Sequence, residues 1–345
     1  MTRELVFLTG AAGFVGAQLV NESLKAGYRV RGSVRRDAQA KQLKAHFDPQ
    51  YGDKAEFVIV SDMTKDGAYD GFLDGVDYIF HVASPLPSSG TNWKKDYIEP
   101  AILGTTNILE AATKVPSINR VVITSSFAAL KPIDGFPEGV PDKESNAANV
   151  HLSPDFPFAN SGQAYAGSKI LADKATTEFV QAKKPHFTVT TIHPSFIYGH
   201  NLLQSSFAEL SPNSTNGWLW KALQTPNPTH GNRGVHIADV TEAHLRALKV
   251  ATESDPDMDP DSWSSGIGKF MLSVQPFDWN KVGDFVKEKY PRVGSKVEGW
   301  EMKGGVVDTT RAEQILGLKH FRSVDEMVAE VIEQQLSFAD FPQSL

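Results

Sequence analysis

Short apolar runs rich in β-branched residues alternate with longer amphipathic segments through the first half of the chain. The run at residues 5–9 predicts a first strand, and the periodicity of residues 14–26 predicts a helix after it. The same alternation continues, with strands expected at 29–34, 56–60, 77–82, 120–125 and 187–193, and helices at 37–46, 97–114 and 163–182. Such alternation is typical of an α/β fold, with a doubly wound parallel sheet covered by helices on both faces.

After residue 195 the pattern is less regular. Clusters of Pro, Asp, Asn and Ser predict loops, which we place at residues 132–160, 205–228 and 254–266. Periodic segments predict three more helices and one strand, at residues 235–250, 278–290 and 324–336 and at 269–274. We therefore expect a core of residues 1–195, to which segments near 232–250 and 268–274 return, and a smaller, largely C-terminal region of residues 196–231, 251–267 and 275–345.

Composition narrows the classes of protein that the chain can represent. The 345 residues carry a formal net charge of −7 and contain no cysteine. The negative charge disfavours nucleic acid as a partner, and the lack of cysteine removes disulfides, thiolate catalysis and cysteine-bound zinc. No apolar run approaches the about 18 residues of a membrane span, and the first strand follows the N-terminus directly. We expect a cytoplasmic protein without a membrane segment and, since no spaced His/Asp/Glu cluster occurs, without a metal site.

A glycine-rich turn joins the first predicted strand to the first predicted helix. It reads Thr9-Gly-Ala-Ala-Gly-Phe-Val-Gly16, a GxxGxxG spacing. Glycine permits the tight turn, a close approach of a pyrophosphate to the backbone, and close packing of helix on strand. The N-terminus of the helix offers unpaired N–H groups to phosphates. In a Rossmann-type βαβ unit this predicts a dinucleotide site formed by Thr9, Gly10, Gly13, Phe14, Val15 and Gly16.

The residues after the second predicted strand indicate which dinucleotide binds. An acidic residue there would bind the ribose hydroxyls of NAD, but the chain has Arg35 and Arg36 instead, with Asp37 one place later. A guanidinium suits the 2′-phosphate of NADP through its charge and its planar donors. We therefore predict NADP(H) as cofactor, held by Arg35 and Arg36, with Asp62 and Met63 bordering the adenine.

A tyrosine and a lysine stand four residues apart, at Tyr165 and Lys169, on one face of a predicted helix. Such pairs also occur on ordinary exposed helices, so their surroundings matter. A free phenol has a pKa near 10, and a neighbouring cation lowers it, so the pair could protonate a carbonyl oxygen as a hydride reaches the carbon. The fifth strand ends in Thr124-Ser125-Ser126, at the sheet edge where ligands bind. We expect one of the two serines to be functional and the other structural.

The chain resembles the extended short-chain dehydrogenase/reductase superfamily over nearly its whole length, and most closely the fungal and yeast aldehyde and ketone reductases of its dihydroflavonol-reductase-like branch. The motifs that carry the resemblance are TGAAGFVG at 9–16, HVASPL at 81–86, RVVITSSFAAL at 120–130, YAGSK at 165–169 and HPSFIYG at 193–199. The segments KPHFT at 184–188, GWLW at 217–220 and FDWN at 277–280 indicate the yeast-type carbonyl reductases.

The resemblance implies roles for individual residues. Tyr165 is the proton donor, Lys169 lowers its pKa and binds the nicotinamide ribose, and Ser126 orients the carbonyl, with Ser125 as the alternative. The remaining expected cofactor contacts are Ala83, Ser84, Thr124, Pro194 and Ser195. The resemblance therefore implies NADPH-dependent reduction of an aldehyde or ketone to the alcohol. We assign structural rather than catalytic roles to His193 and His236.

Aromatic and apolar residues next to these motifs suggest the kind of substrate. We expect the pocket to contain Leu86, Phe127, Phe196, Tyr198 and Trp218. Such a wall suits a small apolar or aryl carbonyl, although each of these side chains could equally pack in the core. We expect the C-terminal region to bind this substrate and the protein to be a monomer or a homodimer.

Two other functions fit parts of the sequence. A nucleotide-sugar epimerase or dehydratase would share the glycine turn and the Tyr–Lys pair, but Arg35 and the aromatic segments disfavour it. A non-catalytic regulator that senses NADP(H) would need only the glycine turn. The retention of Ser126, Tyr165 and Lys169 argues for an enzyme.

Overall fold

The computed structural model describes residues 4–84, 92–135, 140–229, 231–250, 266–302 and 304–342. Its chain divides into two compact units. The first unit comprises Met1–Gly135, Glu144–His193 and Thr241–Phe270. The second unit comprises Phe136–Lys143, Pro194–Val240 and Met271–Leu345.

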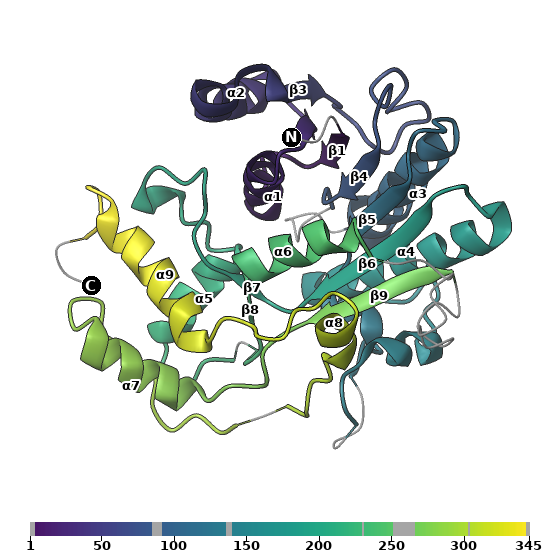
Figure 1. Cartoon of the computed structure of the whole chain (residues 1–345). Helices are drawn as coiled ribbons and strands as arrows, with labels where there is room; N and C mark the ends of the chain where they lie inside the picture. The colour runs from purple at the N-terminus through teal and green to yellow at the C-terminus, as the bar shows by residue number, and fades with distance from the viewer. Residues whose placement is uncertain are drawn as a thin grey trace. The chain divides into compact units, whose positions relative to one another are not determined.

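A seven-stranded sheet forms the centre of the first unit, in the order β3-β2-β1-β4-β5-β6-β9 (Figure 1). The neighbouring pairs from β3 to β6 are parallel. The strands are β1 (Leu5–Thr9), β2 (Arg29–Val34), β3 (Ala55–Ile59), β4 (Tyr78–His81), β5 (Arg120–Thr124), β6 (Thr188–Pro194) and β9 (Ile267–Leu272). The predicted α/β fold with a doubly wound parallel sheet is confirmed.

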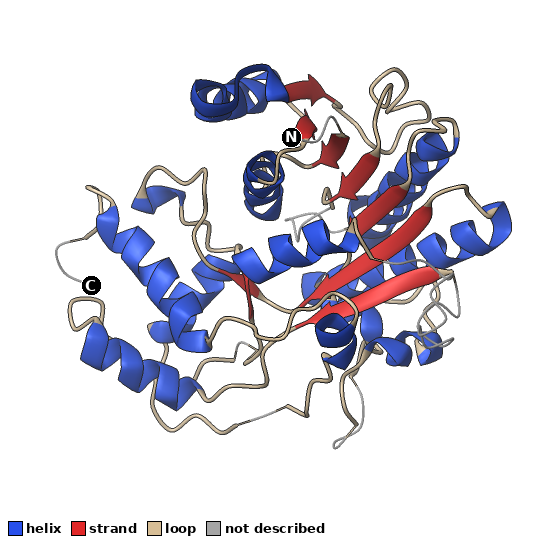
Figure 2. Ribbon diagram, viewed as in Figure 1, coloured by secondary structure: helices blue, strands red, loops and turns tan. Residues whose placement is uncertain are grey.

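Helices connect the strands of this sheet and cover it. Figure 2 shows them beside the strands, and in Figure 1 α1 lies on the opposite side of the sheet from α3 and α4. The helices are α1 (Phe14–Lys25), α2 (Asp37–Tyr51), α3 (Glu99–Thr113), α4 (Ser161–Lys183) and α6 (Ile237–Ala247), the last entering the unit at Thr241. Because helices pack on both faces, the central strands are largely buried, and all five residues of β1 are buried.

The register of the sheet brings the functional strand ends together. Thr9 at the end of β1 is paired with Ser33 on β2 and with His81 on β4, and Thr124 on β5 is paired with Ile192 on β6. The strand order reverses between β1 and β4, which is where open α/β sheets bind their ligands. The carboxyl edge of the sheet is therefore the place at which a site is expected.

The second unit has its own small sheet and its own apolar core. Its strands β7 (Ile197–Tyr198) and β8 (Val235–His236) are parallel. Trp279, Val286, Met327 and Val331 are buried in its core. Its helices are α5 (Thr215–Leu223), α7 (Trp279–Lys289), α8 (Thr310–Gln314) and α9 (Val324–Ser337).

Several elements differ from those predicted. α2 continues through Pro49 to Tyr51 because Phe47 is buried and stacks on Phe57, with ring centres 6.1 Å apart, so packing outweighs the lost hydrogen bond. The stretch expected to be irregular at 205–228 contains α5, whose N-terminus is capped by the Ser214 hydroxyl. The remaining elements absent from the prediction are β7, β8, α8 and the short helices η1 (Gly52–Lys54), η2 (Lys94–Ile98), η3 (Phe127–Leu130), η4 (Glu144–Asn149) and η5 (Phe207–Glu209).

Candidate active site

The glycine turn has the shape of a phosphate cradle. Gly10 has a φ of +75°, and its carbonyl accepts a hydrogen bond of 2.9 Å from the Gly13 N–H. A Cβ on Gly16 would lie 2.1 Å from the Gly10 oxygen, so no other residue fits there without a shift of the backbone. Gly13 is exposed, and Phe14 and Val15 are partly exposed at the start of α1. The first N–H groups of α1 thus remain accessible to an anion.

Arg35 and Arg36 follow β2 and are both exposed. Arg36 forms the N-cap of α2, where its backbone N–H donates to Gln39 Oε1 at 3.2 Å. Within the described part of the chain the Arg35 guanidinium makes no ion pair closer than 4 Å. Arg35 is thus available to an anionic ligand, which is what a phosphate-binding role requires.

Asp62 and Met63 follow β3. Hydrogen bonds from the Thr64 hydroxyl and N–H hold the pKa of Asp62 below its usual value, and the Arg35 charge contributes in the same direction. Met63 is held from the side of α3, because its carbonyl accepts from Asn107 Nδ2 at 3.1 Å and its side chain fills the space above Gly104.

The Thr9 side chain is buried and forms its hydrogen bonds within the protein. It is 1% exposed, and its hydroxyl oxygen accepts from the backbone N–H groups of Val82 and Ala83, each at 3.1 Å. The hydroxyl also shares a hydrogen bond of 2.9 Å with His81 Nδ1, and burial lowers the pKa of His81 to about 3, which leaves the ring neutral. Thr9 therefore fixes the segment that carries Ala83 and Ser84, both of which are partly exposed.

Tyr165 and Lys169 project from α4 toward the end of β5. Burial among neighbouring side chains raises the pKa of Tyr165, and the nearby Ser126 side chain lowers it in part. The Lys169 ammonium lies 5.7 Å from the centre of the Tyr165 ring and donates to Ser84 Oγ at 2.9 Å. Lys169 is 7% exposed, and burial lowers its pKa to about 8. The structure thus brings Ser126, Tyr165 and Lys169 together, with the ammonium bound to Ser84.

The hydroxyls at the end of β5 have different partners. Ser126 lies next to Tyr165, and its hydroxyl oxygen accepts from the Ala128 N–H at 3.2 Å at the start of η3. The Ser125 N–H donates to the Ile192 carbonyl at 2.8 Å, which extends the pairing of β5 with β6. Thr124 Oγ1 lies 2.7 Å from His244 Nε2 on α6, so this hydroxyl is already engaged.

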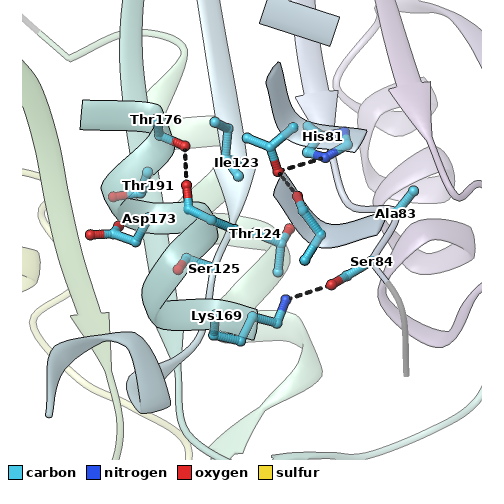
Figure 3. Close-up of a pocket in the computed structure, with 13 residues that line it drawn as sticks. His81, Ala83, Ser84, Ile123, Thr124, Ser125, Lys169, Asp173, Thr176 and Thr191 are labelled. Atoms are coloured by element: carbon cyan, nitrogen blue, oxygen red, sulfur yellow. Dashed lines mark hydrogen bonds between the residues drawn. The ribbon is translucent and has the colours of Figure 1, made fainter. Parts of the chain in front are cut away.

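A polar cavity lies next to Lys169 within the first unit (Figure 3). It offers about 20 Å³ to a water-sized sphere, enough for one or two water molecules. Sequence reasoning did not find it, because its walls come from three strands and two helices. Its lining residues are His81, Ala83, Ser84, Ala101, Thr105, Ile123, Thr124, Ser125, Lys169, Ala172, Asp173, Thr176 and Thr191.

Pro194 and Ser195 begin the second unit, directly after His193. The Ser195 N–H donates to the Leu272 carbonyl at 3.0 Å. The Ser195 hydroxyl is buried and has no hydrogen-bond partner among the described residues.

The predicted pocket residues are distributed over both units. Phe127 is 9% exposed in η3, and Tyr198 is 1% exposed in the core of the second unit. Phe196 stacks on Tyr198 with ring centres 6.4 Å apart and meets the edge of Trp218 at 5.9 Å. Leu86 lies outside the described residues. The more accessible aromatic pair is therefore Phe196 and Trp218, with Tyr198 behind it.

Metal binding and membrane crossing are two other properties that the structure bears on. Among the described residues no group of three or more His, Cys, Asp or Glu side chains is arranged to hold a metal ion. Within the same ranges no helix is long and apolar enough to cross a membrane.

The chain is similar to one protein-family model and to two reductases of known name. The model of the NAD dependent epimerase/dehydratase family matches residues 6–258. The ketoreductase sphI of Aspergillus fumigatus is 40% identical over 99% of this chain and 100% of its own length. Aldehyde reductase 2 of Sporidiobolus salmonicolor is 35% identical over 95% of each chain.

A solved structure supports the fold. Gre2 from Candida albicans, in its complex with NADPH, superposes with a TM-score of 0.79 at 23% identity and covers 98% of this chain and 100% of its own. At this identity the likeness concerns the fold alone. Together with the family match and the curated relatives, it confirms the resemblance inferred from the motifs: the chain belongs to the NAD dependent epimerase/dehydratase family of the extended short-chain dehydrogenases/reductases.

Proposed function

We propose that this chain is an NADPH-dependent carbonyl reductase in which Ser126, Tyr165 and Lys169 reduce an aldehyde or ketone to the alcohol. The observation that carries the proposal is the grouping of Ser126, Tyr165 and a buried Lys169 at the carboxyl edge of the sheet, with the Lys169 ammonium 5.7 Å from the centre of the Tyr165 ring. The names of the ketoreductase and aldehyde reductase relatives agree with this activity. NADPH, when bound, supplies the hydride.

The three side chains have complementary tasks. Ser126 donates to the carbonyl oxygen of the substrate and orients it toward Tyr165. Tyr165, whose pKa burial raises, keeps its proton at neutral pH and delivers it to that oxygen as negative charge develops. The Lys169 ammonium then stabilises the phenolate that remains.

The residues of the first unit fit the proposed cofactor. The Gly10–Gly16 turn leaves no space for a side chain at Gly16 and presents the first N–H groups of α1 to a pyrophosphate. Arg35 is exposed and free of ion pairs with described residues, so it can meet a 2′-phosphate. Arg36, Asp62 and Met63 would border the adenosine.

Arg35→Ala is expected to weaken NADPH binding much more than NADH binding. Loss of a charge-assisted hydrogen bond costs about 1.5–3 kcal/mol, which corresponds to roughly 10- to 150-fold in Kd. Titration of the protein with each cofactor measures the effect. Arg29→Ala is the matched control, because Arg29 is also exposed on β2 but stands at the opposite end of the strand. Equal losses for NADPH and NADH in the Arg35 variant would remove this residue from the role.

The proposed substrate is a small apolar or aryl carbonyl, which the aromatic side chains would contact. Phe127→Ala and Trp218→Ala are expected to shift the relative kcat/KM between small aliphatic and bulky aryl ketones, or the handedness of the product, by about 1–3 kcal/mol. NADPH affinity should barely change. Chiral chromatography of the products and steady-state kinetics provide the measurements.

Trp220→Ala serves as the control for Trp218, since both lie on α5. Trp220 packs against Phe207 and Phe341, with ring centres at 5.6 and 5.9 Å. The Trp220→Ala variant should be less stable, but the relative kcat/KM values for the different ketones should be unchanged. If Phe127→Ala and Trp218→Ala behave in the same way, both aromatics are core residues.

The activity itself is tested by NADPH oxidation against a panel of aldehydes and ketones. Turnover of these compounds, with none of a nucleotide sugar, would support the reductase. The epimerase or dehydratase alternative instead predicts conversion of a nucleotide sugar without net use of NADPH. Tight NADPH binding with no turnover of any carbonyl would favour the regulator.

A further inference from the structure

Asp173 belongs to a buried group of charges inside the first unit. It lies on α4, one helical turn after Lys169, and is 8% exposed. One carboxylate oxygen, Oδ2, accepts a hydrogen bond from the Lys269 ammonium on β9. The carboxylate is therefore anchored on one side only.

His193 does not donate a hydrogen bond to the other carboxylate oxygen of Asp173, Oδ1. Its Nδ1 lies 3.1 Å from the Ser126 carbonyl, which can only accept, so the ring hydrogen is on Nδ1. Burial lowers the pKa of His193 to about 4, so the ring is neutral and Nε2 accepts from the Thr191 hydroxyl at 2.8 Å. Asp173 Oδ1 is 3.6 Å from the same Nε2, too far for a hydrogen bond and facing a lone pair.

Asp173 Oδ1 is consequently a buried acceptor without a hydrogen-bond partner among the described residues. Buried carboxylate oxygens are normally satisfied by protein or by ordered water. Asp173 and Lys169 both line the cavity described above, which has room for one or two waters, and Figure 3 shows Asp173 beside Thr191 and Lys169 directed to Ser84. The cavity therefore has the size and the polarity of an internal water site.

We propose that this cavity holds water that donates to Asp173 Oδ1 and links the carboxylate to the Lys169 ammonium, so that Asp173 is a positioning residue that acts through Lys169. The inference rests on the proposed function of Lys169. Asp173 touches neither Tyr165 nor the reacting atoms in this arrangement. Through this water the negative charge of Asp173 would oppose the effect of burial, which lowers the pKa of Lys169, and would keep the ammonium in the orientation in which it donates to Ser84.

The charged and titratable groups around this cavity come from three strands and one helix. β4 supplies His81 and β6 supplies His193, both neutral because burial lowers their pKa values. Lys269 comes from β9, and α4 supplies Lys169 and Asp173, while the α3 residues on the cavity wall, Ala101 and Thr105, carry no charge. Asp173 is thus the single anion that faces Lys169 among the described residues of the cavity wall.

The decisive variant is Asp173→Asn, which keeps the shape and removes the charge. NMR titration of the lysine side chains in the cofactor-free protein should show the pKa of Lys169 lowered by about one unit, the size expected for one charge several ångströms away. The basic limb of the kcat/KM profile should move to lower pH by about the same amount. A high-resolution crystal structure of the wild-type protein should show water between Asp173 and Lys169.

Two further variants separate this role from a structural one. Asp239→Asn makes the same change at a buried aspartate paired with Arg322 in the second unit, and should reduce stability without moving the Lys169 pKa. Ala101→Val fills the cavity but leaves the Asp173–Lys269 pair intact, and should lower the Lys169 pKa as Asp173→Asn does. This variant and the crystal structure decide the question if Asp173→Asn does not fold.

An unchanged Lys169 pKa in folded Asp173→Asn or in Ala101→Val, or a cavity without water, would overturn the proposal. A lack of carbonyl reduction by the wild-type protein would instead overturn the proposed function. The NMR titration and the crystal structure distinguish these results, because neither needs turnover.

Discussion

Tyr165→Phe is expected to lower kcat by about a hundredfold or more while leaving NADPH affinity nearly unchanged. The change removes only the hydroxyl that would protonate the carbonyl, and loss of a general acid has effects of this size. The ring remains and keeps its contact with the Lys169 side chain, whose ammonium lies 5.7 Å from the ring centre. Steady-state turnover and fluorescence titration with NADPH measure the two quantities.

Tyr69→Phe is a suitable control for this result. Tyr69 is 2% exposed in the core of the first unit, and its hydroxyl has no hydrogen-bond partner among the described residues. Removing that hydroxyl should therefore leave both turnover and NADPH affinity as they are. Near-normal turnover of Tyr165→Phe would show that the proton comes from another group.

Lys169→Met is expected to abolish most activity and, at neutral pH, to stabilise the fold. The change removes the ammonium that assists Tyr165 and would bind the nicotinamide ribose, so both kcat and NADPH affinity should fall. Burial lowers the pKa of Lys169 from 10.5 to about 8, so its charge opposes folding by an amount on the order of 3 kcal/mol. Methionine fills similar space without a charge.

The stabilisation expected from Lys169→Met should decrease as the pH rises. Lys169 holds its proton less tightly in the folded protein than in the unfolded chain. From pH about 8 to 10.5 the unfolded chain therefore binds more protons, and the wild-type protein gains stability as the pH rises. The advantage of Lys169→Met in thermal unfolding should be largest below pH 8 and should shrink toward pH 10.5.

Lys25→Met is the control, since Lys25 is exposed at the end of α1 and forms only a surface ion pair with Glu22. It should change neither activity nor the slope of stability with pH. A Lys169→Met protein that loses rate but keeps NADPH affinity would argue against the ribose contact. Equal melting temperatures for this variant and the wild type throughout the pH range would show that the buried charge does not oppose folding.

Much of the first unit follows from local patterns. The strands β1 and β2 begin and end at the predicted residues, because an apolar β-branched run between helix signals has few other conformations available. The glycine turn is equally local, since the 2.1 Å clearance at Gly16 depends on residues only six apart. The shared face of Tyr165 and Lys169 follows from the period of an α-helix.

The start of α5 and the position of Asp173 were not predicted, although both have local signals in the sequence. Ser214 caps α5, and the serine-to-glycine spacing before the Trp-containing helix could have indicated its start. Asp173 follows Lys169 by four residues, so helix periodicity already places the two on one face of α4. The sequence alone does not distinguish such an acid from one on an exposed surface.

The tertiary structure decides which polar groups meet. The hydroxyl of Thr9 binds His81, 72 residues away, and the backbone of the following segment, so its partners are internal. The Ser126 hydroxyl likewise lies next to Tyr165, whereas the Thr124 hydroxyl lies 2.7 Å from His244 Nε2. The partners of these hydroxyls depend on which strands are neighbours in the sheet. The order β1-β4-β5-β6 is set only when the sheet assembles.

By itself the sequence determined the period of each main element, the glycine turn and the Tyr165–Lys169 face, because these depend on neighbours within about one or two helical turns. Only the tertiary structure decided that Asp173 would meet Lys269, 96 residues later, and keep one oxygen unpaired beside a polar cavity. Such a cavity forms where several strands and helices converge. No single segment carries its pattern, because the energy of a buried charge depends on every wall around it.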